Sequence, residues 1–412
     1  MDYISVFISL LFLFIIGFFL LKFLRKKEDF KRTLNLTFLK VTMPKKDSQL
    51  DEKSDTAKDF KEMVSLMEQL YSSLKSIHSR KIVKKILGQD ILSFEYIAHQ
   101  WDIYFFLVIP KNYKHLIEKQ INGFYADAII EETTELNIFK DKQFYTGCYL
   151  NTTKDLFFPI KTYQKLEADP INNITNAFSK LEDDESAAIQ ILLRPVDDDW
   201  QSDCSKASTK IMKWKKVGFS LNPLRILGAL LEIFISNNDE EKNPNQDGET
   251  SALTQERAKT VDEKGEKTWF ETIIRVVAAG NNKHMVETEL TNIISAFTQF
   301  SYPDFNKFGS TLHHNKQTLI NNYIYRYFRK PFYLKKMVLN TEEISSIFHF
   351  PHIKYNKTPE IKWQNFKIVK APSNLPKEWL LIWHNIYRWV KKEIRIKNED
   401  RFRHFYVIWQ TG

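Results

Sequence analysis

Apolar positions divide the middle of the chain into stretches of helical and of strand periodicity. Apolar residues recur every three or four positions over residues 63–77, which predicts an amphipathic helix. Residues 91–109 alternate between apolar and polar with a polar break near the centre, which is typical of a β-hairpin. Residues 113–125 again show helical spacing and lead into a strand at 128–130. We therefore expect an α+β arrangement built on antiparallel strands.

Further elements follow, and those after residue 269 repeat the strand-then-helix order of residues 102–125. The pair Asp169-Pro170 is favoured at the start of a helix. Further along, apolar spacing predicts a strand at 270–277 and a helix at 284–297. A short helix should begin at Asn340, where Glu343 completes a capping box. The order of elements predicts two mixed α/β modules of related layout, with antiparallel sheets.

The opening of the chain has the length and composition of a membrane span. Residues 3–21 carry no charge and consist mainly of Ile, Leu and Phe. At about 1.5 Å per residue this stretch would cross a hydrocarbon core roughly 30 Å thick. Basic residues from Lys22 to Lys27 follow, and the positive-inside rule then places the N-terminus outside and the body in the cytoplasm. We expect a single-pass transmembrane helix at 1–27 in the cell membrane, with the lipid bilayer as partner; a cleaved signal peptide is the alternative.

The chain between the two modules loses its apolar residues. Residues 237–268 consist largely of Asn, Asp, Glu, Lys, Gln and Thr, which is the composition of a flexible linker. We therefore expect a boundary there. The predicted domains are the anchor, a juxtamembrane spacer at 28–61, a first α+β module at 62–236, the linker, a second α+β module at 269–370, and a further domain that starts at 371–412.

Composition adds few constraints on function. The chain has 43% apolar and 27% charged residues, as folded proteins do. Its net charge of +9 fits an anionic partner such as nucleic acid, and it equally fits a lysine-rich solvated surface. Cys148 and Cys204 are too few for a disulfide framework, and the 10 histidines show no metal-ligand spacing. No metal, cofactor or catalytic residue is therefore predicted.

The end of the chain begins like a nucleotide-binding loop. Residues 405–408 are apolar, as a buried strand is, and the polar Gln410, Thr411 and Gly412 come after them. A P-loop requires the pattern G-x-x-x-x-G-K-[ST] directly after such a strand. Trp409 occupies the position of the first glycine, so the pattern is incomplete.

Three phrases carry a resemblance to a known family. They are "ADPINNITNAFSKLEDDESAAIQILLRPVDDDWQ" at 168–201, "LNTEEISSIFHFPH" at 339–352 and "RFRHFYVIWQTG" at 401–412. Together they resemble the N-terminal half of membrane-anchored ATPases of type IV secretion and conjugative DNA transfer, which belong to the HerA- and FtsK-like group of P-loop motors. The resemblance extends from about Asp90 to the end of the chain.

The resemblance implies a remnant of a nucleotide site. Gln410, Thr411 and Gly412 match the second to fourth positions of the family's loop G-Q-T-G-T-G-K-S, with Trp409 at the first. The catalytic lysine, the Mg²⁺-binding hydroxyl and the Walker B acid have no counterpart, and backbone amides alone do not replace them. Residues 371–412 would then be the start of a truncated P-loop ATPase domain, and we expect no ATP hydrolysis from the chain as it stands.

The tryptophans are a second departure from the family pattern, since several stand where the resemblance implies glycine. The chain has 11 glycines and 9 tryptophans, whereas an average near 7% glycine would give roughly 29. One hypothesis is that the source organism reads these codons as glycine, and the other is a sequence truly rich in tryptophan. The positions in question are Trp101, Trp269, Trp379, Trp383, Trp389 and Trp409.

The expected function is the membrane-anchoring and assembly portion of a translocation motor of this kind, itself without a complete ATP site. Its partners would be copies of itself or other secretion-system subunits. The alternative is a stand-alone single-pass membrane scaffold with no nucleotide chemistry. A basic segment near the end would attract nucleic acid, but the acidic residues within it fit a solvated face equally well. Its basic residues are Lys391, Lys392, Arg395, Lys397, Arg401 and Arg403.

Overall fold

The computed structural model describes residues 3–45, 60–197, 200–212, 252–313, 315–364, 369–387 and 390–403. Within these ranges, nine strands form one antiparallel sheet in the order β4-β1-β3-β2-β6-β7-β5-β8, with β9 paired to β7. The α+β class with antiparallel sheets is therefore confirmed. The strands are β1 (Leu36–Thr42), β2 (Leu92–His99), β3 (Asp102–Pro110), β4 (Ile129–Thr133), β5 (Phe144–Thr152), β6 (Ser186–Pro195), β7 (Trp269–Gly280), β8 (Phe308–Leu312) and β9 (Met337–Asn340).

Several of the helices follow the predicted periodicities. The stripe at 63–77 forms α3 and the short 3₁₀ turn after it, and the stripe at 113–125 forms α5. The helices are α1 (Tyr3–Leu34), α3 (Phe60–Leu74), α4 (Ile82–Leu87), α5 (Lys114–Phe124), α6 (Ile171–Phe178), α7 (Trp200–Met212), α9 (Ala252–Gly265), α10 (Lys283–Ala296), α11 (Lys316–Ile324) and α12 (Thr341–Ile347). Short 3₁₀ turns lie at Lys75–Ile77, Lys111–Tyr113, Tyr163–Lys165, Phe297–Phe300 and Glu399–Phe402.

Two units of the same topology lie side by side in the sheet. The first consists of β1-α3-β2-β3-α5-β4 and the second of β5-α6-β6-β7-α10-β8, so both follow the βαββαβ order of ferredoxin-like folds. In both units the fourth strand lies beside the first, the first beside the third and the third beside the second. Their second strands, β2 and β6, pair antiparallel and join the units into one sheet.

The units do not divide at the expected linker. Strands β6 and β7 lie on either side of residues 237–268 in sequence, yet they are direct neighbours in the sheet. The N-terminal part of that stretch lies outside the described residues, and its C-terminal part forms α9, which packs against α7. Strand β1, in the segment expected to be a spacer, lies inside the sheet between β4 and β3.

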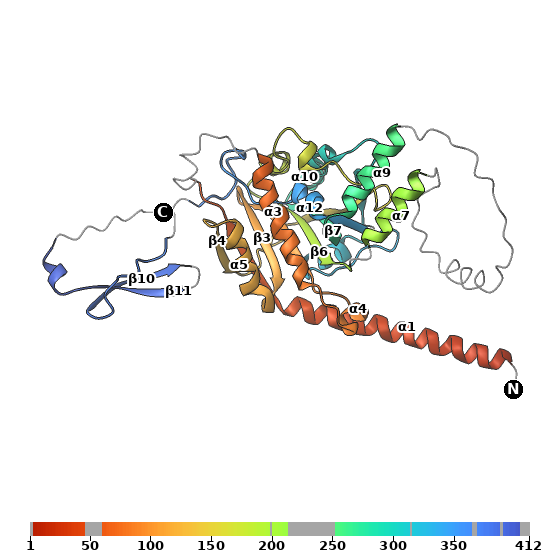
Figure 1. Ribbon diagram of the computed structural model, residues 1–412, viewed down its shortest axis with the longest axis horizontal. Coiled ribbons are helices and arrows are strands. Elements are labelled where there is room, and N and C mark those ends of the chain that lie inside the picture. Colours follow the sequence, from red (N-terminus) through yellow and green to blue (C-terminus); the bar gives the residue numbers. More distant parts are fainter. Residues whose placement is uncertain are drawn as a thin grey trace.

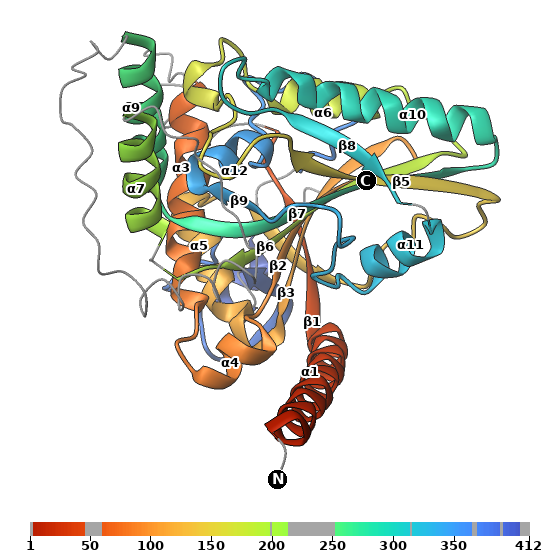
Figure 2. The ribbon, with the colours of Figure 1, turned by 90° about the vertical axis from the view of Figure 1, so that its right-hand side faces the viewer.

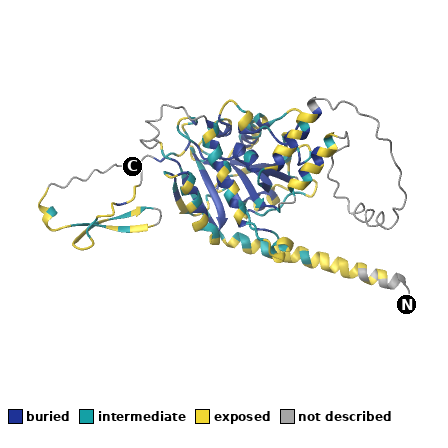
Figure 3. Ribbon diagram, viewed as in Figure 1, coloured by how far each residue is buried: buried dark blue, intermediate teal, exposed yellow. Residues whose placement is uncertain are grey.

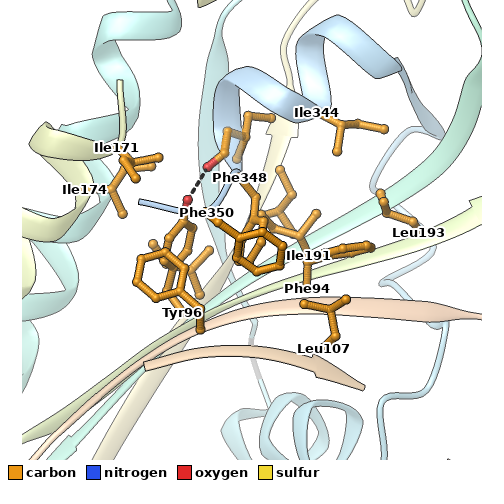
Figure 4. Close-up of a cluster of buried hydrophobic side chains, with 14 of the residues drawn as sticks. Phe94, Tyr96, Leu107, Ile171, Ile174, Ile191, Leu193, Ile344, Phe348 and Phe350 are labelled. Atoms are coloured by element: carbon orange, nitrogen blue, oxygen red, sulfur yellow. Dashed lines mark hydrogen bonds between the residues drawn. The ribbon is translucent and has the colours of Figure 1, made fainter. Parts of the chain in front are cut away.

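The main core lies between the sheet and helices α3, α5, α6, α10 and α12. Phe348, just after α12, contacts Tyr96 and Phe94 of β2 with ring centroids 4.6 and 5.4 Å apart (Figure 4). The Tyr96 hydroxyl donates a 3.0 Å hydrogen bond to the Ile347 carbonyl, which fixes the end of α12 above the sheet. The predicted capping box of Asn340 and Glu343 is present at the start of α12. Both faces of the central strands are buried (Figure 3).

A smaller layer covers the opposite face of the sheet. Helix α11 and the segment after it pack there, away from α10, as Figure 2 shows. Leu319 and Tyr323 of α11 contact a cluster that includes Ile97, Leu192 and Val277. The sheet is therefore the middle layer of three.

The predicted transmembrane helix at 1–27 is wrong. Among the described residues, no helix is long and apolar enough to cross a membrane. Helix α1 continues without a break through the charged residues beyond Lys22 to Leu34. The helix extends from the body and is fastened at its C-terminal end, where Arg32 donates hydrogen bonds to the carbonyls of Leu87 and Gly88 at 3.0 and 2.6 Å (Figure 1).

Backbone angles and burial distinguish among the tryptophans at positions where the hypothesis expects glycine. Gln100 and Trp101 form the two-residue turn between β2 and β3 with φ of 51° and 66°. Such turns favour Asn-Gly because both residues have positive φ. Trp379 has a φ of 85°, which also favours glycine. Trp269 differs, since it is 3% exposed, stacks on Trp200 at 5.9 Å and donates from its indole to the Lys264 carbonyl. The geometry therefore favours glycine at 101 and 379 and tryptophan at 269.

Candidate functional site

The predicted nucleotide-loop remnant falls in the last residues of the chain. Trp409, Gln410, Thr411 and Gly412, together with the strand expected at 405–408, lie outside the described residues. The basic segment before them is partly described. Arg395 donates two hydrogen bonds to Glu393, at 2.8 and 2.7 Å, and these bonds lower the pKa of Glu393. Acidic and basic side chains thus pair on this segment.

This segment forms a hairpin of β10 (Leu380–Tyr387) and β11 (Val390–Ile396), which stands apart from the body (Figure 1). The body here means the two βαββαβ units with their covering helices. The hairpin exposes large apolar side chains, with Trp383 61% and Val390 67% accessible. Asn385 fastens it to the preceding segment by a 3.1 Å bond to the Val369 carbonyl. A two-stranded hairpin alone is at best marginally stable in water, so this surface fits contact with a partner.

A row of buried polar side chains crosses the sheet on the face that α11 covers. Glu95 of β2, Gln190 of β6 and Arg275 of β7 are neighbours in register. Gln190 donates to Glu95 at 3.0 Å, and Arg275 donates to Gln190 at 2.7 Å. Arg275 also donates to the carbonyls of Asn322, Tyr327 and Arg329. The row thus holds the segment after α11 on the sheet.

A buried acid–histidine pair in the main core looks at first like catalytic machinery. His349 lies 3.0 Å from Asp169 through Nε2 and 2.8 Å from the Ser345 carbonyl through Nδ1. Asp169 also accepts hydrogen bonds from Asn356 and from the Ile171 backbone N–H at the start of α6. Because both ring nitrogens are engaged inside the core, the pair serves to connect α6 to the segment after α12.

The two cysteine thiols are not activated either. Burial raises the pKa of Cys148 and of Cys204 to about 12, so both thiols stay protonated near neutral pH. Over the part of the chain that the structure describes, no group of three or more His, Cys, Asp and Glu side chains is placed to hold a metal ion.

A charged cleft of about 620 Å³ lies where β6 and β7 leave the sheet, beside α1, α4 and the first turn of α7. Arg194 of β6 lies directly opposite Glu271 of β7 and pairs with it at 2.7 Å. Lys336, just before β9, is 3.8 Å from the same carboxylate and 5.0 Å from the centre of the Trp200 ring. Arg25, Lys84 and Lys85 lie on the facing wall.

These cleft residues were not predicted as site residues. Arg194 is a charged residue near the end of an otherwise mostly apolar strand, and this signal in the sequence could have pointed to it. Lys336 and Glu271 come from distant parts of the chain, and only the pairing of β6 with β7 and of β7 with β9 brings them to Arg194.

Comparison with known proteins places the body in a family. No curated protein matches the chain in sequence. Residues 53–364, which begin just before α3 and end where the body ends, match the model of a family described as a domain of unknown function (DUF8128). Because this match covers well over half of the chain, the protein belongs to the DUF8128 family.

Proposed function

We propose that the chain is an assembly module of a translocation motor of the type IV secretion and conjugation kind, and that the β10–β11 hairpin makes the contact with a partner subunit. The observation that carries this proposal is the set of large apolar side chains that the hairpin presents to solvent. They are Leu380, Trp383, Ile386 and Val390. The resemblance of the flanking phrases to such motors supplies the kind of assembly.

The body supports this role as a rigid platform. The chain that leads toward the hairpin is held on the sheet by a 2.7 Å bond from the Ile103 N–H to the Glu360 carbonyl and a 2.9 Å bond from the Gln364 N–H to the Met43 carbonyl. The point from which the hairpin leaves is therefore fixed.

The hairpin surface also has the shape of a contact site. A hollow of about 390 Å³ lies between the hairpin and residues 369–372, with Trp383 and Ile386 in its lining. An apolar side chain of a partner would displace water from this hollow and cover both residues, and burial of apolar area contributes about 25 cal/mol per Å².

The test is the association state of the full chain, measured by light scattering over a range of concentrations. The variant Trp383→Ser/Ile386→Ser/Val390→Ser should lose association that the unaltered chain shows. The matched control is Ile82→Ser/Val83→Ser/Leu312→Ser, which removes equally exposed apolar side chains from the body and should associate normally. Equal behaviour of the two variants would contradict the role of the hairpin.

The kind of assembly needs a second test in cells. Deletion of the gene from its host should stop transfer of DNA or protein between cells while growth continues. Normal transfer, in a host where the hairpin still supports association, would favour the stand-alone scaffold instead.

A further inference from the structure

We infer that the charged cleft binds a phosphate ester of about nucleotide size, held by Arg194 and Lys336. This inference concerns the body and does not depend on the assembly role proposed for the hairpin. Two observations support it: two cations that share one carboxylate, and further basic side chains from α1 and α4 in the lining of the cleft.

The excess of positive charge is centred on Glu271. Arg194 and Lys336 both pair with this one carboxylate, at 2.7 and 3.8 Å. Lys330 is close enough to interact with the same groups. Burial lowers the pKa of Lys330, while Glu271 opposes this shift and Lys336 adds to it. The cleft as a whole is lined by five basic side chains and four carboxylates, so its lining carries one net positive charge, and Arg194 and Lys336 share the single carboxylate of Glu271.

The facing wall is basic as well. Arg25 of α1 is fixed there by a 2.8 Å hydrogen bond from its Nε to the Ile86 carbonyl. Lys84 pairs with Asp90 at 2.6 Å, and Lys85 lies 3.5 Å from Asp197 with about half of its side chain exposed. A ligand with phosphate at one end would contact Arg194 and Lys336, and the second wall would hold any further negative charge.

Gly88 sits at the junction of the two walls. Its φ of 100° is a conformation that favours glycine. A Cβ added there would lie 3.3 Å from an Arg32 nitrogen and 3.5 Å from an Arg194 nitrogen. Glycine thus permits the close approach of the backbone to both guanidinium groups, while its own N–H is bonded to the Lys84 carbonyl and its carbonyl accepts from Arg32.

The chemistry of the two binding residues favours phosphate. Arginine presents a planar fork of donors that matches phosphate oxygens, and lysine adds a compact point charge. Lys336 and Arg194 are both partly exposed, with 36% and 26% of the side chain accessible, so a ligand can reach them. The cleft volume falls in the range of small-molecule sites, which is roughly 300–1,000 Å³.

The test compares two neighbouring lysines in the full chain by isothermal titration calorimetry with ADP. Lys336→Glu should weaken ADP binding about tenfold or more, because it removes one charged donor and adds repulsion. The matched control, Lys335→Glu, changes net charge identically, but Lys335 is 68% exposed, pairs with Asp155 and does not line the cleft. Its ADP affinity should stay within about twofold of the unaltered chain.

Further probes identify the source of the phosphate. Inorganic phosphate should compete with ADP, and adenosine should not bind. If a single-stranded oligonucleotide binds more tightly than ADP, with a steep dependence on salt, and Lys336→Glu weakens it, the phosphate belongs to nucleic acid. Equal losses in Lys336→Glu and Lys335→Glu, in proteins that unfold at the same temperature, would overturn the inference. So would a lack of binding of ADP, phosphate and oligonucleotide at millimolar concentration.

Discussion

Arg326 holds Glu95 by two hydrogen bonds of 3.0 Å, one from Nε to Oε1 and one from Nη2 to Oε2, although 231 residues separate them in sequence. Both side chains are almost fully buried. Arg326 also pairs with Glu135, so one guanidinium group connects β2, the segment after β4 and the segment after α11. This contact closes the second layer over the sheet.

Removing Arg326 should destabilise the fold strongly. Arg326→Ala leaves the Glu95 carboxylate buried without its counter-ion, and the free energy of unfolding should fall by about 3–5 kcal/mol. Arg257→Ala is the matched control, since Arg257 pairs with Asp304 at a similar distance of 3.0 Å but at the surface. It should cost about 1 kcal/mol or less. Urea unfolding measures the stability of both variants. Similar losses of stability would show that the buried ion pair stabilises the fold no more than the surface pair does.

Replacing Trp101 by glycine should stabilise the protein. A residue with a side chain in the left-handed conformation costs about 1–2 kcal/mol, and Trp101 is 57% exposed, so little burial is lost. Trp269→Gly should instead cost about 3–5 kcal/mol, because it removes a buried indole that stacks on Trp200. Chemical denaturation of both variants tests this contrast. The peptide mass of the natural protein at position 101 decides independently which residue is encoded, and a tryptophan mass there would end the glycine hypothesis at that site.

Glu343 should contribute more to the stability of the fold than a residue that only caps a helix. It accepts from the Asn340 and Ile160 backbone N–H groups and lies 3.1 Å from Lys264, with both charged side chains almost fully buried. Glu343→Gln replaces the carboxylate by a neutral amide of the same shape and leaves the buried Lys264 without its counter-charge, so it should cost about 3–5 kcal/mol. Asn340→Ala removes the cap and a 3.3 Å bond to the Lys264 carbonyl but leaves the ion pair in place, and it should cost about 1 kcal/mol.

A double-variant cycle separates the two contributions of Glu343. In the background Lys264→Met no buried cation remains, so adding Glu343→Gln should cost clearly less than it does in the unaltered chain. Additive losses in unfolding experiments would mean that the ion pair contributes little.

Acid should lower the stability of the fold, partly by protonating Asp169. Burial raises the pKa of this carboxyl, but charge and hydrogen bonds from His349, together with hydrogen bonds from Ile171 and Asn356, outweigh burial and hold the pKa below its ordinary 3.8. Because the folded pKa is depressed, the stabilisation is complete above about pH 4 and is lost as pH falls through the folded value. Asp169→Asn should therefore be less stable at neutral pH, and its deficit should shrink below about pH 4. A constant deficit in unfolding curves from pH 2 to pH 7 would contradict this assignment.

Local elements were the most predictable part of the fold. The hairpin at 91–109, the helices at 113–125 and 284–297, and the capping box of Asn340 and Glu343 occur as the spacing indicated. Each depends on residues a few positions apart, whose preferences act wherever the rest of the chain lies.

The N-terminal segment shows where this reasoning fails. A run of apolar residues predicts a span by its length, but the helix that forms continues through Lys22 and ends at Leu34 on the body. Contacts of Arg32 with Leu87 and Gly88 fix that end of the helix. No sequence pattern within the N-terminal segment predicts these contacts.

The sequence by itself determined the α+β class of the fold and several local elements, among them the hairpin at 91–109 and the capping box at Asn340. Only the tertiary structure decided that β2 and β6 join two βαββαβ units, and that Glu271 and Lys336 lie beside Arg194. The physical reason is that helices and hairpins depend on neighbours in sequence, whereas the order of strands in a sheet depends on which distant strands bury their apolar faces together. The position of a cleft at the ends of such strands therefore depends on the strand order, and local sequence patterns do not predict it.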